Sequence, residues 1–301
     1  MKRTKPVTLL ILLCGALAAP LGAQTTEAQR AAAVLGSVAY RVVPNVVYQV
    51  ADGYEAKLDL YLPRGQQAPR PTLIQFHGGG WTGGSKESTA LRFLPYLEMG
   101  WAVVNVEYRL ARVALAPAAV EDCLCALRWI IRNAEQYNID VSQLVVTGYS
   151  AGGHLALTTG IVPASAGLDR QCPGNERLDV AAVVNWFGIT DVGDLLDGEN
   201  MKRYAVQWMG SMPNRYEIAE RVSPLSYVRR DLPPVLTIHG DADPTVPYDH
   251  AVRLRDALTE AGVPNQLHTV PGGGHGNFSA TQYVEAYEVI RAFLKQHGVG
   301  S

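Results

Sequence analysis

The segment from Gly148 to Gly152 reads Gly-Tyr-Ser-Ala-Gly and matches the pattern G-x-S-x-G. In this pattern the serine stands on a sharp turn between a strand and a helix, and small residues two positions to either side allow the turn to close. An apolar run at 144–147 precedes the segment, and a helical pattern begins near Ala151. Amides at the start of a helix favour negative charge on a nearby oxygen. We therefore predict that Ser150 is a nucleophile.

A serine hydroxyl needs a base that takes its proton, and a histidine oriented by a carboxylate is the usual partner. After a G-x-S-x-G serine, the acid and then the histidine follow along the chain. His275, in the glycine-rich stretch 271–276, is the predicted base. The stretch 239–247 offers two aspartates, of which we choose Asp243 as the acid. Asp241 lies nearer the preceding strand, where its short side chain is expected to shape the turn.

A glycine run at 78–80 follows the apolar run 72–76, within the sequence His-Gly-Gly-Gly-Trp. Glycines let backbone N–H groups approach a substrate without side chains in the way, as an oxyanion hole requires. Such a hole combines amides of this kind of loop with the amide that follows the nucleophile. The predicted donors are the amides of Gly79, Gly80 and Ala151.

Aromatic and histidine side chains near these groups receive other roles. Trp81 is predicted to form a wall of the substrate pocket, and Tyr149 to contact the substrate. His77 is expected to brace the glycine loop, His154 to pack or cap on its helix, and His239 to hydrogen-bond locally at a strand end. Three further histidines are interpreted as surface or strand residues: His250, His268 and His297.

The glycine loop also matches a competing pattern. Gly78, Gly80 and Gly83 have the G-x-G-x-x-G spacing of a dinucleotide site, but a lone match is a weak signal. Lys86 is misplaced for a phosphate-binding P-loop. The histidines and carboxylates show no helical i, i+4 pairing with a third ligand, so no metal site is predicted. Serine-based hydrolysis needs no cofactor.

Compact apolar runs alternate with helical patterns over most of the chain. Runs of this kind suit strands buried on both faces of a parallel sheet flanked by helices, an α/β architecture. Two earlier segments, 42–50 and 56–62, alternate in polarity and are predicted to be antiparallel strands at one edge of the sheet. The predicted parallel strands are 72–76, 102–106, 144–147, 180–187, 235–239 and 267–270.

Helices are predicted between these strands. The clearest are 118–137, which has a regular apolar face, and 249–261, which ends at Gly262 with Pro264 beyond. The segment 191–225 has glycines, prolines and aromatic residues but no strand pattern. We expect it to be a small lid-like, substrate-facing insertion.

The N-terminus has the pattern of an export signal. Three basic residues precede an apolar run at 7–19, which is shorter than the ~20 residues of a membrane-spanning helix. We predict a signal peptide at 1–23 and a single catalytic domain at 24–301, so that the protein is secreted or periplasmic without stable membrane insertion. A short helix is expected at 25–37. A membrane anchor or lipidation at Cys14 is the competing interpretation.

Removal of the signal would leave three cysteines in an oxidising compartment. We expect a disulfide from Cys123 or Cys125 to Cys172, and the alternative is buried free thiols. The net charge of −2 and the absence of basic runs argue against nucleic acid or anionic membranes as partners. A small-molecule or polysaccharide-linked substrate is the expected partner.

With these residues in hand, the chain resembles the α/β-hydrolase esterases, and in particular the secreted bacterial group of acetylxylan and feruloyl esterases. The stretches that carry the resemblance are 58–63, 77–81, 108–110, 117–122, 148–154, 223–225 and those that contain Asp243 and His275. The resemblance implies the α/β-hydrolase fold, a Ser150–His275–Asp243 triad and hydrolysis of short acyl esters such as acetyl or feruloyl groups.

Two other groups with the same fold resemble this chain less closely. Esterases similar to hormone-sensitive lipase usually have aspartate where this chain has Tyr149, and they carry a larger N-terminal cap. Peptidases of the prolyl-oligopeptidase type share the fold, but they normally have a propeller that this chain is too short to hold. A peptidase or amidase without a propeller stays the alternative function, and a binding protein that keeps the scaffold without catalysis is a further one.

Overall fold

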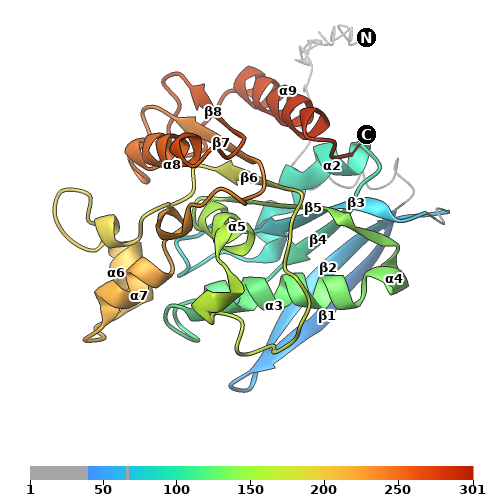
Figure 1. Ribbon diagram of the computed structural model, residues 1–301, viewed down its shortest axis with the longest axis horizontal. Helices are drawn as coiled ribbons and strands as arrows, with labels where there is room; N and C mark the ends of the chain where they lie inside the picture. The colour runs from blue at the N-terminus through green and yellow to red at the C-terminus, as the bar shows by residue number, and fades with distance from the viewer. Residues whose placement is uncertain (1–39, 66–67, 301) are drawn as a thin grey trace, which may run out of the picture.

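The computed structural model describes residues 40–65 and 68–300. Its centre is an eight-stranded sheet in the order β1-β2-β4-β3-β5-β6-β7-β8 (Figure 1). β1, β2 and β4 pair antiparallel, and every other neighbouring pair is parallel. The strands are Tyr40–Ala51 (β1), Tyr54–Pro63 (β2), Arg70–Phe76 (β3), Ala102–Val106 (β4), Ile139–Tyr149 (β5), Ala182–Trp186 (β6), Val235–Gly240 (β7) and Asn265–Val270 (β8).

Helices flank the sheet on both faces. The α-helices are Leu94–Glu98 (α2), Ala118–Arg132 (α3), Ala134–Tyr137 (α4), Ala151–Ile161 (α5), Arg203–Met209 (α6), Arg215–Arg221 (α7), Asp249–Glu260 (α8) and Ala280–Gln296 (α9). Segments of 3₁₀ helix lie at Lys86–Phe93 (η1), Ala164–Ala166 (η2), Gly193–Leu195 (η3) and Pro224–Tyr227 (η4). None of the helices in the described ranges is both long and apolar enough to cross a membrane.

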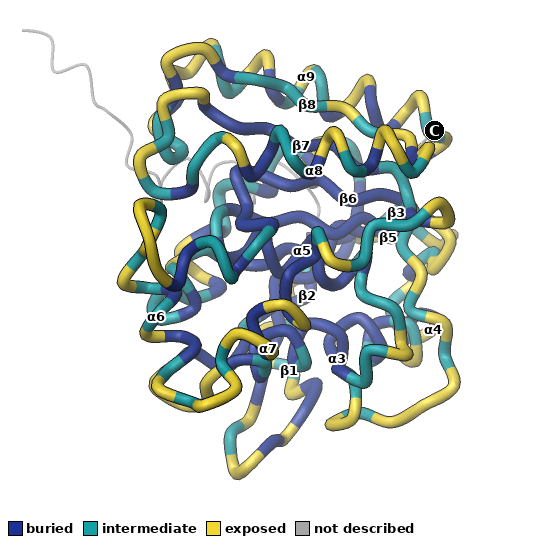
Figure 2. Tube along the Cα trace, turned by 60° about the vertical axis from the view of Figure 1, so that its left-hand side comes forward, coloured by how far each residue is buried: buried dark blue, intermediate teal, exposed yellow. Residues whose placement is uncertain are grey.

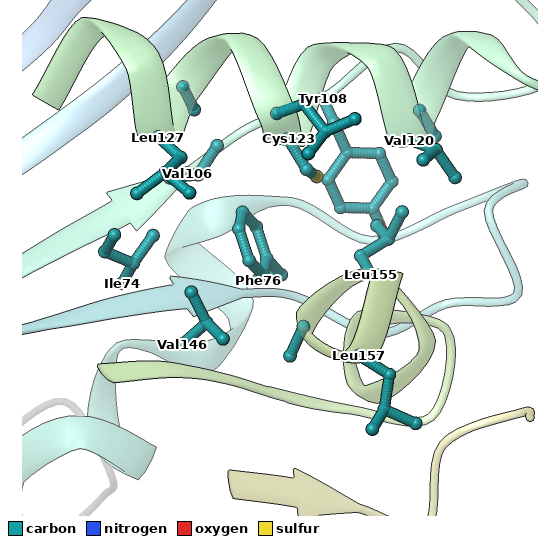
Figure 3. Close-up of a cluster of buried hydrophobic side chains, with 14 of the residues drawn as sticks. Ile74, Phe76, Val106, Tyr108, Val120, Cys123, Leu127, Val146, Leu155 and Leu157 are labelled. Atoms are coloured by element: carbon teal, nitrogen blue, oxygen red, sulfur yellow. The ribbon is translucent and has the colours of Figure 1, made fainter. Parts of the chain in front are cut away.

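Two apolar cores separate the sheet from its helices. Successive side chains of a strand point to opposite faces, so Leu73 of β3 packs with α2 and α9 whereas Ile74 packs with α3, α5 and α8. Figure 3 shows the core that contains Ile74, in which Cys123 of α3 and Leu155 of α5 lie beside Tyr108, and Phe76 lies between them and Ile74. Burial on both faces explains why these strands are continuous apolar runs.

The strand predictions are confirmed, with small shifts at the ends. β6, for example, covers 182–186 within the predicted 180–187, and the two antiparallel strands lie at the sheet edge. The predicted helix 118–137 is interrupted at Asn133, whose side-chain amide donates to the Trp129 carbonyl at 2.7 Å beside its own backbone amide at 3.0 Å. The prediction did not include η1, α2 or α9.

The segment 191–225 forms η3, α6, α7 and the start of η4 and contains no strand, as expected. It is joined to the rest of the domain by buried polar and aromatic contacts. His250 of α8 is fully buried, accepts a hydrogen bond from the Thr190 amide at 3.1 Å and lies 3.1 Å from Asp194 of η3. The interpretation of His250 as a surface or strand residue was therefore wrong.

A disulfide joins Cys125 of α3 to Cys172, and Cys123 is free and buried. This result decides between the two pairings left open, in favour of Cys125. Figure 2 shows exposed residues concentrated on the connecting loops around a buried sheet.

The predicted signal peptide and the short helix predicted at 25–37 lie outside the described residues.

Candidate active site

Ser150 stands between the end of β5 and the start of α5 with φ 58° and ψ −120°. This backbone conformation is costly for a residue with a side chain. A Cβ atom on Gly148 would collide with the backbone of Gly152, and one on Gly152 would collide with the backbone of Phe76. The two glycines therefore let the strand, the turn and the helix approach closely. The Ser150 amide donates to the Trp186 carbonyl at 2.9 Å, which fixes the turn to β6.

The three residues predicted as nucleophile, base and acid come together in one hydrogen-bonded row. The Ser150 hydroxyl lies 2.8 Å from Nε2 of His275, and Nδ1 of the same ring lies 2.7 Å from Oδ2 of Asp243. Asp243 follows β7 and His275 follows β8, so both loops open at the carboxyl edge of the parallel strands. The Phe187 ring lies 4.8 Å from the His275 ring and packs against it edge-on.

The Asp243 carboxylate is fully supplied with donors. Its Oδ1 accepts from the amides of Thr245 and Val246 at 2.8 and 3.0 Å, and Nε2 of His239 lies 3.3 Å from Oδ2. Burial would raise the pKa of Asp243, but the hydrogen bonds from His239 and His275 outweigh burial and hold that pKa well below its usual range. The acid is therefore ionised at neutral pH and can orient an imidazole.

Asp241, the rejected candidate for the acid, has a different role in the structure. Its carboxylate accepts from the Gly272 amide at 2.6 Å and so ties the loop after β7 to the loop after β8. The contact shapes the two turns that present Asp243 and His275.

The glycine loop after β3 lies beside the nucleophile. Gly79 and Gly80 have φ of 121° and 58°, and a Cβ on Gly80 would strike the side chain of Tyr204. Among the described residues, neither amide has a backbone or side-chain acceptor, and the amide of Ala151 is in the first turn of α5, where no helical acceptor exists. These three unpaired donors have the chemistry that an oxyanion hole requires.

Trp81 is not at the pocket surface. It is fully buried, stacks on Trp208 of α6 at a centroid distance of 4.0 Å, and donates from Nε1 to Nδ1 of His154 at 3.2 Å. The structure therefore contradicts the prediction that Trp81 forms a pocket wall, because the positive φ of Trp81 turns its side chain beneath the loop. His77, also buried, stacks on Tyr108, as expected for a bracing residue.

A cavity of about 380 Å³ opens over Ser150. Tyr149, predicted to contact the substrate, lines this cavity, and its hydroxyl lies 3.1 Å from the Tyr287 hydroxyl. Tyr204 of α6 also lines it and donates from its hydroxyl to the Thr245 carbonyl at 3.1 Å, so the 191–225 insertion contributes a side chain to the cavity. The residues around the cavity are Gly78, Gly79, Gly80, Ser88, Thr89, Arg92, Tyr149, Ser150, Phe187, Tyr204, Thr245 and His275.

Sequence analysis missed Arg92, Phe187, Tyr204 and Thr245. Phe187 and Thr245 follow strand ends, so the rule that parallel strands present ligand-binding residues at their carboxyl edge could have found them. No sequence signal marked Arg92 or Tyr204. Within 40–65 and 68–300, no group of three or more metal-ligating side chains is placed to hold a metal ion.

Comparisons with known proteins agree with this geometry. The BD-FAE family model matches residues 58–258. Esterase LipQ of Mycobacterium tuberculosis is 30% identical over 82% of the chain, which spans 60% of the length of LipQ. Ethyl acetate hydrolase of Pseudomonas putida is 31% identical over 82% of this chain and 80% of its own length. A solved carbohydrate esterase from gut microbiota, in truncated form, is 30% identical with a TM-score of 0.72 over 86% of this chain and 98% of its own.

The predicted fold class is confirmed: the molecule is an α/β-hydrolase, with a mostly parallel sheet between layers of helices, like its esterase neighbours. The chain belongs to the BD-FAE family, whose model covers both the glycine loop and the G-x-S-x-G turn.

The buried histidine beneath the glycine loop predicts a dependence of stability on pH. Neutral His154 accepts from Trp81 at Nδ1 and donates from Nε2 to the Val222 carbonyl at 2.7 Å, so one neutral tautomer satisfies both nitrogens. Burial lowers the pKa of His154 to about 4, against the opposing effect of the Val222 bond. An unfolded chain titrates near ~6.5. The stabilisation is therefore complete above pH ~6.5 and is lost as pH falls towards ~4, by up to about 3 kcal/mol.

Urea unfolding between pH 4 and 8 checks this linkage. In His154→Gln, the fall in the free energy of unfolding below pH ~6.5 should be smaller than in the wild type. Thr158→Val, a change on the same helix that removes no titrating group, should lower stability by the same amount at every pH. Equal pH slopes in the wild type and His154→Gln would refute the assignment.

Proposed function

We propose that the protein is a carboxylic-ester hydrolase that works through an acyl-enzyme on Ser150. The observation that carries the proposal is the row of hydrogen bonds from Ser150 through His275 to Asp243, with Ser150 and His275 lining the same small cavity as Gly79 and Gly80. The esterase names of the relatives support the same chemistry.

Each residue has a defined step in this mechanism. The Ser150 oxygen attacks the ester carbonyl carbon while its proton passes to Nε2 of His275. The amides of Gly79, Gly80 and Ala151 donate to the resulting oxyanion. When the tetrahedral intermediate collapses, His275 gives its proton to the departing alcohol oxygen. A water molecule then attacks the acyl-enzyme with His275 as base, and the acid leaves as Ser150 recovers its proton. Asp243 keeps the imidazole in the required tautomer.

The first test removes the nucleophile. Ser150→Ala should lower kcat on short p-nitrophenyl esters by more than about 10³-fold while the fold and KM change little. The exposed Ser142, on the same strand, provides the matched control as Ser142→Ala. Undiminished turnover in Ser150→Ala would contradict the mechanism. Faster turnover of aminoacyl amides than of esters by the wild type would instead assign the site to a peptidase.

The cavity size supports short acyl groups as substrates. Its volume of about 380 Å³ lies near the lower end of small-molecule pockets. The name ethyl acetate hydrolase fits an ester with a small acyl part, and the name carbohydrate esterase fits an ester whose alcohol part is a sugar. We propose acetyl or feruloyl groups, carried by plant polysaccharide, as the substrate class.

A chain-length series tests the acyl preference. We expect kcat/KM on p-nitrophenyl esters to be highest at two to four carbons and to fall at longer chains, because the cavity cannot enclose them. Acetylated and feruloylated xylan, compared in the same assay by product release, separate the two acyl groups. A maximum at eight or more carbons with no release from either xylan would reject the proposal.

We propose further that the protein is exported and that residues 1–23 are removed as a signal peptide. The sequence pattern at the N-terminus and the Cys125–Cys172 disulfide support this localisation, because structural disulfides persist mainly in oxidising compartments.

Expression with the native N-terminus in a bacterial host checks export. The protein should accumulate in the periplasm or medium with a new N-terminus near Gln24, measured by mass spectrometry of the intact chain. Leu12→Arg, which interrupts the apolar run, should keep the chain in the cytoplasm. Export with residues 1–23 still attached would contradict signal cleavage.

A further inference from the structure

The active-site cavity contains one permanently charged side chain. Of the residues around it, only Arg92 carries a fixed charge, and no aspartate or glutamate lines the wall. The carboxylate of Asp243 hydrogen-bonds to His275 and is fully buried, so it does not line the cavity. The electrostatic character of the cavity is therefore set by a guanidinium that no acid on the wall neutralises.

Arg92 is held by aromatic residues instead of a counterion. Its guanidinium lies 4.2 Å from the centroid of the Tyr149 ring, and Nη1 donates to the Tyr283 hydroxyl at 3.1 Å. The Tyr287 hydroxyl donates to the Arg92 carbonyl at 2.6 Å, so the backbone is fixed as well as the side chain. None of the ion pairs formed by the described residues includes Arg92.

This arrangement leaves hydrogen-bonding capacity directed at the cavity. A guanidinium has five N–H donors in a planar fork, and within the described residues only Nη1 of Arg92 has an acceptor. Its Nε and Nη2 atoms are not among the buried polar atoms that lack a partner, so they are accessible to solvent, and the residue itself lines the cavity. Partial burial makes an unpaired charge costly, and a carboxylate that matches the fork removes that cost.

Neighbouring residues make Arg92 a preorganised site. Tyr149, on which the guanidinium stacks, is adjacent to the nucleophile in sequence, so Arg92 is fixed relative to Ser150 through one residue. A stacked, immobilised arginine loses little further side-chain entropy when it binds an anion. A neutral ester can accept single hydrogen bonds from the guanidinium, but only a carboxylate offers two charged oxygens that match the planar fork.

We propose that Arg92 is a specificity-determining residue that binds a carboxylate of the substrate, so that among the polysaccharide and small-molecule esters of the proposed function the enzyme prefers those in which the acyl or the alcohol part carries a free acid. The inference rests on the proposed ester hydrolysis at Ser150. The carboxylate belongs either to the acyl part, as in a half-ester of a dicarboxylic acid, or to the alcohol part, as in an acylated hydroxy acid. Both present the same planar anion to Arg92.

Pairs of isosteric substrates test the proposal in the wild-type protein. Monoethyl succinate against ethyl succinamate places the charge in the acyl part, and acetoxyacetate against acetoxyacetamide places it in the alcohol part. Each pair differs only by a carboxylate or a neutral amide. We expect kcat/KM, measured by acid release, to favour the carboxylate in one pair by at least about 10-fold, which also identifies the part that carries it. No preference in either pair would overturn the proposal.

Substitution then assigns the preference to Arg92. Arg92→Gln should lower the ratio of kcat/KM for the preferred carboxylate to kcat/KM for its neutral amide by about 10- to 100-fold, as expected for a charged hydrogen bond. Arg92→Lys should retain part of the preference, because it keeps the charge without the fork. Arg255→Gln, on the exposed side of α8, removes the same charge away from the cavity and should change neither substrate.

The outcomes separate this inference from the proposed function. An equal loss on the carboxylate and its amide in Arg92→Gln would mean that Arg92 only braces Tyr149, and it would overturn the inference while ester hydrolysis stands. If the wild-type protein hydrolyses neither the neutral esters nor p-nitrophenyl acetate, the proposed ester hydrolysis itself is refuted. If Arg92→Gln fails to fold, competitive inhibition of wild-type p-nitrophenyl acetate hydrolysis by succinate but not by succinamide supports the inference, and equal inhibition overturns it.

Discussion

Ser150 keeps a backbone conformation that costs free energy for any residue with a side chain, and the surrounding chain must hold it there. The Ser150 amide is bonded to β6, and the glycines two positions away let β3, β5 and α5 meet without side chains between them. The fixed position of Ser150 therefore determines where His275 and the glycine loop must lie if they are to reach its hydroxyl. The loops after β3, β7 and β8 reach the hydroxyl because their strands end at the same edge of the sheet.

The sequence was sufficient where a residue type has a single physical use. Runs of apolar residues without polar interruption predicted the parallel strands, and glycines around Ser150 predicted the turn, because no other residue fits there. His275 and Asp243 were found from chain order. Their mutual distances, by contrast, depend on how two loops fold, and on bonds such as that from the Gly272 amide to Asp241, which no periodicity encodes.

Tertiary contacts explain what the sequence did not reveal. Trp81 has the size and position of a pocket wall, yet its place in the structure is decided by Trp208, far along the chain, on which it stacks. His250 has no local pattern that marks burial, and its partner Asp194 lies 56 residues away. Arg92 is part of the pocket only because α9 brings Tyr283 and Tyr287 beside it.

The stack of Trp81 on Trp208 also bears on how such enzymes diversify. Loops that decorate an α/β-hydrolase sheet are usually regarded as interchangeable parts that vary while the catalytic scaffold stays constant. Here α6 supplies the aromatic surface beneath the very loop that carries Gly79 and Gly80, and its Tyr204 packs on Gly80 itself. The insertion and the glycine loop are therefore packed as one unit. A redesign that replaces α6 must also supply a new surface for Trp81 and space beside Gly80.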